Sequence, residues 1–131
     1  MTSNALSLLG LALRGGNLAV GEEPVADACK TGRAKLVLIA ADAAENSAGR
    51  ASRWAEAKSV PWTRVPWDKA AMGFALGRST CAMAALTDSG LAGALAVKLL
   101  QTDESLRSAL EPLLNEKKKP RAQKKPAMPE T

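Results

Sequence analysis

The sequence predicts an α/β domain, a three-layer α/β/α sandwich around a small, mostly four-stranded mixed sheet. Residues 36–40 and 81–86 are uninterrupted apolar runs. Strands of this kind leave no face for water, so helices must cover both sides of their sheet. Helix-like and strand-like patterns also alternate along the chain, as they do in layered α/β folds. The length of 131 residues suits one domain with a short extension.

The expected elements follow the chain from one breaker to the next. In order they are a helix ending at Arg14, a strand at 18–20, a helix at about 22–31, a strand at 36–40, a helix through Lys58, a strand at 62–65, a short helix ending at Gly77, a strand at 81–86, and a helix containing Leu91, Leu95 and Leu99.

Local signals justify the first half of this order. Polar cap candidates at residues 2–4 precede leucines at helical spacing, and Gly15 and Gly16 close that helix. Pro24 is tolerated in the first turn of the second helix, where its missing N–H would have no helical partner. Gly32 suits the end of that helix.

Further signals justify the second half. Asn46 or Ser47 is expected to cap the third helix, with Trp54 and Ala57 facing inward. The strand at 62–65 follows Pro61 and alternates in polarity. Asp68 is expected to cap the fourth helix, and Thr87 or Asp88 the fifth.

The C-terminal part is predicted to divide at two points. Residues 1–101 form the domain, and residues 102–115 form a short helical extension that Pro112 should limit. Residues 116–131 hold lysine, proline and polar residues without an apolar period, which predicts a disordered basic tail.

Charge is distributed unevenly. The chain has 18 basic and 13 acidic residues, and six of the bases lie after residue 115 with only two acids. The body is therefore almost neutral, and a uniformly basic nucleic-acid surface is not predicted.

Several classes of function are disfavoured by what the chain lacks. It has no histidine, the commonest general base and metal ligand, and no phosphate-binding glycine loop. Cys29 and Cys81 lie in apolar stretches and are predicted to be reduced core thiols. We therefore expect no enzymatic activity, no metal and no small-molecule cofactor. No run is long enough to span a membrane and no signal peptide is evident, so a cytoplasmic location is expected.

The tryptophans leave two interpretations open. Trp54 is expected in the core, whereas Trp62 and Trp67 flank a strand. They suit either packing or stacking on unpaired bases.

Four short motifs carry a resemblance to a known family. They are Leu-Gly-Leu-Ala-Leu-Arg at 9–14, Gly-Glu-Glu at 21–23, Gly-Arg-Ala-Lys-Leu-Val-Leu at 32–38, and the glycine-containing segment 72–78. With the order of elements, they resemble the ribosomal protein L7Ae/L30e/Gadd45 superfamily, in particular its bacterial YlxQ-like subgroup, over about residues 5–100. The resemblance implies a small ribosomal or RNA-binding protein of α/β/α fold.

For members that bind RNA kink-turns, the resemblance implies the signature Gly-x-Asn-Glu-x-x-Lys, which falls on residues 21–27. Only Gly21 matches, since Glu23, Pro24 and Asp27 replace asparagine, glutamate and lysine. Asp27 puts an anion where a phosphate-neutralising cation is expected. The departures argue against standard kink-turn recognition.

The resemblance implies an RNA-facing edge made by the start of the second helix and two neighbouring loops. The candidate RNA-binding residues are Gly21, Glu22, Glu23, Arg33, Asp42, Arg50, Arg53, Gly77 and Arg78, with Lys117, Lys118 and Lys119 of the tail. Any one of these arginines alone is more often a solvated charge than a phosphate contact. The tail lysines equally suit a solubilising end, or a sequence-independent attraction to RNA that falls with salt.

The leading hypothesis is a non-enzymatic protein that binds structured RNA, ribosomal or ribosome-associated, with a monomer favoured. The first alternative is a protein–protein adaptor that keeps the fold without kink-turn recognition. A second alternative is a substrate-recognition domain like those attached to RNA-modifying enzymes, which the absence of a catalytic partner domain in this sequence disfavours.

Overall fold

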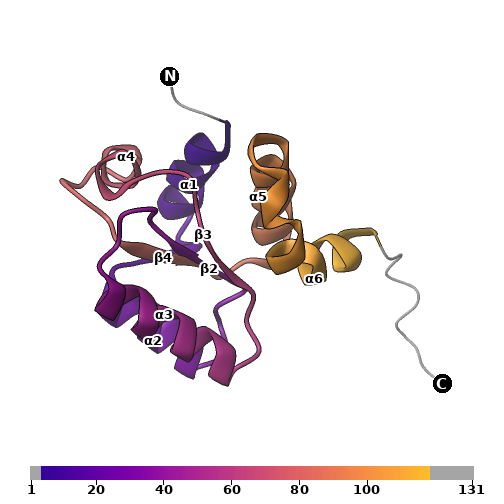
Figure 1. Cartoon of the computed structure of the whole chain (residues 1–131), viewed down its shortest axis with the longest axis horizontal. Helices are drawn as coiled ribbons and strands as arrows, with labels where there is room; N and C mark the ends of the chain where they lie inside the picture. The colour runs from indigo at the N-terminus through magenta and orange to yellow at the C-terminus, as the bar shows by residue number, and fades with distance from the viewer. Residues whose placement is uncertain (1–3, 119–131) are drawn as a thin grey trace.

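A four-stranded mixed sheet forms the centre of the protein, whose computed structural model describes residues 4–118 (Figure 1). The strands are β1 (Leu18–Val20), β2 (Leu36–Ile39), β3 (Trp62–Arg64) and β4 (Met83–Leu86), in the order β1-β4-β2-β3. Strand β4 is antiparallel to β1 and β2, and β2 is parallel to β3. The predicted mixed, four-stranded sheet is confirmed.

Helices cover both faces of this sheet. Helices α2 (Glu22–Lys30) and α3 (Glu45–Ala57) lie side by side on one face (Figure 1). Helices α1 (Asn4–Arg14) and α5 (Ser89–Thr102) cover the other face, with α4 (Lys69–Ala75) against α1. The three-layer sandwich is therefore also confirmed.

The core forms where the apolar runs predicted it. All four residues of β2 and of β4 are buried, because each strand has a neighbour on both sides and helices on both faces. Helix α3 packs against the core through Ala48, Ala51 and Ala55. Their small side chains let the helix lie close to its neighbours. Ala57 is exposed, so its predicted inward position is wrong, whereas Trp54 packs against the core.

Helix caps agree with the sequence at two sites and differ at one. The side chains of Asp68 and Asp88 accept backbone N–H bonds at the starts of α4 and α5, as predicted. Helix α3 begins at Glu45 with Ala44 as its N-cap and no capping side chain, so Asn46 and Ser47 lie inside the helix. Ser47 instead bonds across to α2, which accounts for the difference.

The C-terminal extension is longer than predicted. A 3-10 turn, η1 (Glu104–Leu106), leads into α6 (Arg107–Lys118), which continues through Pro112. Leu110, Leu113 and Leu114 are buried, and α6 packs on α5 and β3. The burial of these apolar side chains offsets the loss of the helical hydrogen bond that proline, which has no N–H, cannot make. Residues 116–118 are thus helical, and the rest of the predicted tail lies outside the described residues.

Candidate functional site

Four connections meet at one edge of the sheet. The backbone N–H of Gly21 donates to Met83 at 3.1 Å, Ala40 N–H to Ala82 at 2.9 Å, and Val65 N–H to Ile39 at 2.8 Å. The ends of β1, β2 and β3 therefore lie beside the start of β4. We call this edge the rim, comprising residues 21–23, 40–45, 64–69 and 76–82.

Backbone contacts join the loops of the rim to one another. Ala41 N–H donates to the carbonyl of Trp67 at 2.8 Å, and Cys81 N–H to that of Lys69 at 3.0 Å. The carboxylate of Asp42, a predicted RNA-binding residue, accepts the Lys69 N–H at 2.8 Å. Asp42 thus ties the loop after β2 to the start of α4.

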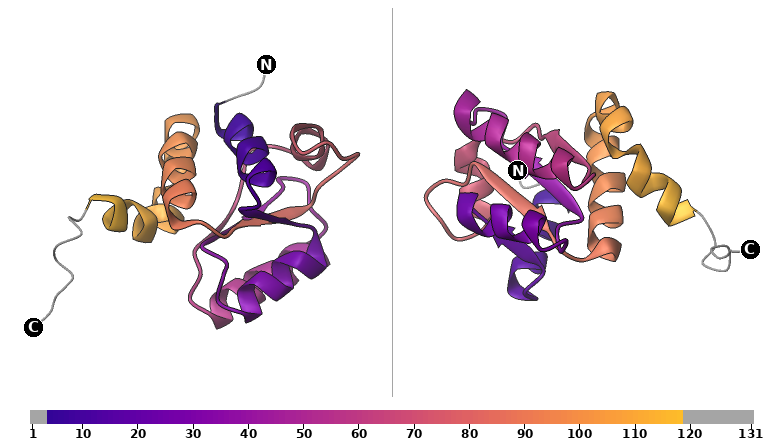
Figure 2. Two further views of the ribbon diagram at one scale, coloured as in Figure 1. Left: turned by 180° about the vertical axis from the view of Figure 1, so that it is seen from behind. Right: turned by 90° about the horizontal axis from the view of Figure 1, so that it is seen from below.

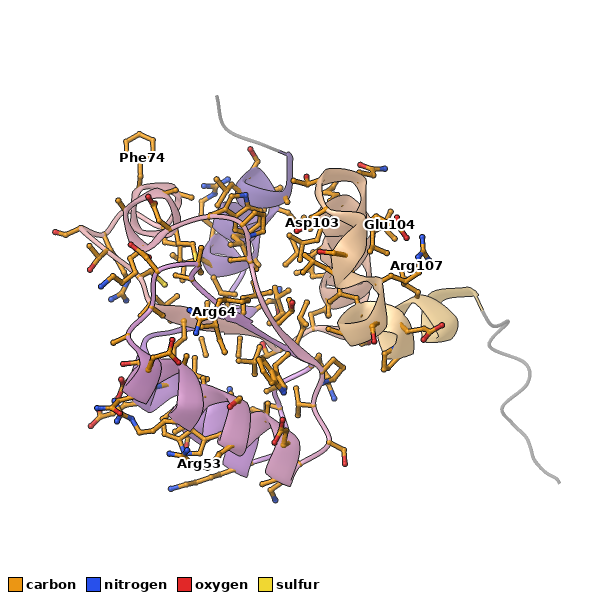
Figure 3. The ribbon with its side chains drawn as sticks, viewed as in Figure 1. Arg53, Arg64, Phe74, Asp103, Glu104 and Arg107 are labelled. Atoms are coloured by element: carbon orange, nitrogen blue, oxygen red, sulfur yellow. The ribbon has the colours of Figure 1, made fainter. Side chains whose placement is uncertain are left out.

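Arg64 is a rim residue that the sequence analysis missed. Its guanidinium donates to the carbonyls of Ala40 and Ala41 at 3.3 and 3.1 Å and lies 3.8 Å from the Glu45 carboxylate (Figure 3). It therefore braces the loop between β2 and α3. The one sequence signal for Arg64 was its position near the end of the predicted strand at 62–65. The structure shows that this strand, β3, lies parallel to the buried β2.

Glu22 and Arg50 are brought together, but they bind each other. Their side chains form an ion pair at 2.6 Å, and Ser47 donates to the same Glu22 oxygen at 2.9 Å. These two hydrogen bonds, with Arg50 the larger cause, hold the pKa of Glu22 below its ordinary value. The pair joins the starts of α2 and α3 across the rim.

The start of α2 presents backbone donors. Gly21 has φ +97°, which L side chains rarely adopt, and this turn ends β1 and starts the helix. Among the described residues, the N–H groups of Glu22 and Glu23 have no hydrogen-bond partner, and Pro24 has no N–H to offer. Glu23 is exposed and makes no ion pair within the described part of the chain.

Helix α4 adds an aromatic side chain that is not among the candidate RNA-binding residues. Phe74 is 82% exposed, and its ring points away from the body of the protein (Figure 3). After α4 the chain turns at Gly77, with φ +74°, to the exposed Arg78. Arg78 makes no ion pair with any described residue. An exposed ring beside the rim is thus followed, four residues later in the chain, by a rim guanidinium that has no ion pair with a described residue.

The tryptophans favour packing over stacking. Trp54, Trp62 and Trp67 are all partly buried against the core. The indole N–H of Trp62 donates to Glu56 at 3.1 Å, which satisfies its polar edge.

Arg33 is not at the rim, contrary to the prediction. It follows the far end of α2, where it donates to the Asp27 carboxylate at 2.8 Å and to the Thr31 hydroxyl at 3.0 Å. Because β2 starts three residues later, Arg33 lies at the opposite end of the sheet. Arg33 was expected at the rim because it belongs to one of the family motifs, and the order of the strands places it elsewhere.

Two other predicted groups also lie away from the rim. Arg53 is exposed in the second half of α3, beyond its rim end (Figure 3). Lys117 and Lys118 end α6, on the side of the protein opposite the loop between α4 and β4 (Figures 1 and 2). Lys119 lies outside the described residues.

The rim carries more acids than bases. Its acids are Glu22, Glu23, Asp42, Glu45 and Asp68, and its bases are Arg64, Lys69 and Arg78, with Arg50 one turn into α3. Long-range attraction of a polyanion is thus weak here, and recognition at the rim depends on short-range contacts.

Other site chemistry is limited within the described residues. Cys29 and Cys81 are free and buried, as predicted, and burial raises the pKa of both thiols. No group of three potential metal ligands occurs among the described residues. None of the described helices has the length and apolar character that crossing a membrane requires.

Comparison with known proteins gives consistent matches. The model of the ribosomal protein L7Ae/L30e/S12e/Gadd45 family matches residues 3–95. The RNA-binding protein YlxQ of Bacillus subtilis (strain 168) is 35% identical over 88 residues, which cover 67% of this chain and 87% of that protein.

Two solved structures share the fold. A protein of unknown function from Bacillus halodurans superposes with a TM-score of 0.70 and 28% identity, over 75% of this chain and 98% of its own. The 15.5 kD RNA-binding protein of Giardia lamblia superposes with a TM-score of 0.59 at 24% identity, over 77% of this chain and 85% of its own, and that likeness concerns the fold alone.

Proposed function

The chain belongs to the ribosomal protein L7Ae/L30e/S12e/Gadd45 family, and from this membership we propose that it is a non-enzymatic, cytoplasmic protein that binds structured RNA at the rim. The relative that is named an RNA-binding protein aligns with 67% of the length of this chain. The single observation that carries the assignment is the gathering of the α2 start and the neighbouring loops at one edge of the sheet. Ribosomal RNA is the target we favour, bound by a monomer.

Short-range contacts support this proposal better than net charge does. The amides of Glu22 and Glu23 are donors at a helix start with no hydrogen-bond partner among the described residues, a geometry suited to a phosphate or a base edge. Arg78 supplies a guanidinium with no ion pair among the described residues, for a phosphate contact on the neighbouring loop.

Phe74 supplies the apolar part of the proposed contact. A ring that is 82% exposed offers a stacking surface for an unpaired base, and such stacking tolerates any base. In this proposal an unpaired base of the bound RNA stacks on Phe74 while Arg78 holds an adjacent phosphate.

Standard kink-turn recognition is not part of the proposal. Asp27, at the last position of the signature, is engaged by Arg33 at 2.8 Å. Pro24 replaces a side chain able to hydrogen-bond with a ring that cannot. A different structured RNA is therefore the expected target.

Charge reversal at Arg78 tests the proposed function. Arg78→Glu is expected to weaken binding to a ribosomal RNA fragment by about tenfold or more in a mobility-shift assay, since it replaces a phosphate-neutralising charge with a repelling one. Arg107→Glu, on the far side of the protein, is the matched control. Equal losses in the two variants, with unchanged thermal unfolding, would mean that the rim is the wrong surface.

The exposed Phe74 also favours a second candidate, an adaptor that binds protein through the same rim. Its apolar ring and the slight excess of acids suit a partner with an apolar pocket and basic surroundings. In the same assay, an adaptor is expected to show only weak RNA binding that salt abolishes.

A further inference from the structure

The edge of the sheet opposite the rim has a different electrostatic character. There Lys35 N–H donates to Leu86 at 2.6 Å, Thr87 N–H to Asn17 at 3.0 Å, and Val37 N–H to Pro61 at 2.9 Å. We call this end the far edge, comprising residues 14–17, 30–35, 58–61 and 87–88. The 13-residue helix α3 runs from the rim to the far edge. At ~1.5 Å per residue, its length separates the two edges by roughly 20 Å.

Bases outnumber acids at the far edge. It contains Arg14, Lys30, Arg33, Lys35 and Lys58 against the single acid Asp88, with Asp27 and Glu56 just before it. Lys30, Lys35 and Lys58 are exposed and make no ion pair within the described part of the chain.

The acids near the far edge are already engaged. Asp27 pairs with Arg33 at 2.8 Å, Glu56 accepts from the Trp62 indole at 3.1 Å, and Asp88 caps α5 through Leu91 N–H at 2.9 Å. None of them forms an ion pair with the three lysines among the described residues. The excess of positive charge therefore faces solvent.

We propose that the far edge binds the phosphate backbone of a second RNA segment, so that the protein joins two segments held at opposite ends of α2 and α3. This inference rests on the proposed RNA binding at the rim. The rim, with more acids than bases, selects by short-range contacts. The lysines of the far edge supply the sequence-independent attraction that the rim lacks, by releasing counterions from RNA.

Helix stabilisation does not account for the whole cluster. Lys30 ends α2 and Lys58 follows the end of α3, positions where a cation favours the negative end of a helix dipole. Lys35 lies in the connection that enters β2, four residues past Thr31, the C-cap of α2. A helix dipole acts only within its last turn, so Lys35 gains little from it.

The test replaces the three lysines together. The Lys30→Gln/Lys35→Gln/Lys58→Gln variant is compared with a control of equal charge loss elsewhere, Arg53→Gln/Lys98→Gln/Arg107→Gln. Binding to a ribosomal RNA fragment is measured across a salt series. We expect the far-edge variant to lower the slope of log affinity against log salt by about 2, and affinity in low salt by about tenfold or more, from ~0.7–0.9 per phosphate contact. The control is expected to change neither by as much.

A second measurement tests the bridging directly. One RNA fragment is immobilised, and capture of a second, labelled fragment by the added protein is recorded. The wild type is expected to capture it, and the far-edge variant to lose that capture while still binding the immobilised fragment. Thermal unfolding checks the fold of each variant, and if the triple variant is unstable, Lys35→Gln alone carries the test.

The outcomes separate this inference from the proposed function. Loss of binding in Arg78→Glu with no effect of the far-edge variant beyond its control overturns the inference and leaves the rim assignment standing. Loss in the far-edge variant without loss in Arg78→Glu supports phosphate binding at the far edge, but it overturns the rim assignment and, with it, the proposal that the protein joins two RNA segments. Absence of capture by the wild type overturns the bridging.

Discussion

Glu22 illustrates how a residue of the expected binding surface can serve the fold. Its position after Gly21 suggested a contact with RNA, but its carboxylate accepts from Arg50 at 2.6 Å and from Ser47 at 2.9 Å. Both partners come from α3, 25 and 28 residues later in the chain. The carboxylate therefore fixes the angle between two helix starts, and the backbone amides beside it remain for a ligand.

The first prediction concerns acid stability. Because the folded-state pKa of Glu22 is depressed by Arg50 and Ser47, its stabilising effect is present above the ordinary glutamate pKa of about 4.3. It is lost as pH falls through the depressed value. Arg50→Ala should lower the melting temperature at pH 7, and the difference from the wild type should shrink towards pH 3. NMR titration of the Glu22 carboxyl should show its pKa rising in the variant, and an unchanged pKa would contradict the role of the pair.

At the scale of elements, α4 and the loop after it form one closely packed unit. A Cβ on Gly73 would lie 2.6 Å from the Cα and 2.7 Å from the N of Thr80, both backbone atoms that have little freedom to move. The absence of a side chain at this position thus sets where the loop carrying Gly77 and Arg78 lies. The position of a rim residue depends on a glycine inside a helix.

Gly73→Ala should displace that loop. The substitution favours the helix by propensity, about 1 kcal/mol, but the contact with Thr80 forces a backbone shift that costs about 1–3 kcal/mol. We expect a net loss of stability or none, with weaker RNA binding through the displaced Arg78. Chemical-shift changes centred on residues 76–82 would report the displacement. Gly90→Ala, near the solvent-exposed start of α5, is the control, and a gain in stability with normal RNA binding in Gly73→Ala would contradict this account.

Helix α6 shows packing overriding a helix breaker. Pro112 was expected to limit the extension, yet the helix continues to Lys118. The buried side chains of Leu110, Leu113 and Leu114 lie on both sides of the proline, so their contact with the core holds the helix together across it.

Pro112→Ala should therefore stabilise the protein. Alanine restores an N–H that can donate to the Ser108 carbonyl, and it removes the proline ring that crowds the preceding helical turn. We expect the free energy of unfolding to rise by about 1–3 kcal/mol. Urea unfolding measures it. Leu110→Ala, on the buried face of the same helix, should destabilise by about 2–5 kcal/mol. No gain from Pro112→Ala would mean that the ring contributes to packing beside Ala109 and β3.

At the scale of the whole molecule, charge is sorted between the two ends of the sheet. Net charge along the sequence suggested a neutral body and a basic tail. In three dimensions the body is itself divided, with more acids than bases at the rim and more bases than acids at the far edge. The end of α6, from which residues 119–131 continue, lies on the side away from the rim (Figure 2).

Deleting residues 119–131 should lower RNA affinity and its salt dependence together. The deletion leaves α6 intact and removes Lys119, Arg121, Lys124 and Lys125 with one acid, Glu130. Fewer phosphate contacts mean fewer released counterions, so both quantities fall in the same salt series. If the truncated protein keeps the salt slope of the full-length protein, these basic residues take no part in RNA binding. The rim and the far edge would then account for all of the binding.

The sequence by itself determined the layers of the fold, the order of its elements and the family. Continuous apolar runs such as residues 36–40 can only be buried on both faces, and breakers such as Gly32 and Pro61 act within a few residues. Only the tertiary structure decided which end of the sheet each charged residue occupies and which charges already have partners. Arg33 lies at the far edge, Arg64 lies at the rim, and Glu22 forms an ion pair with Arg50. The sequence did not predict these placements because they depend on strand order and on contacts between residues far apart in the chain.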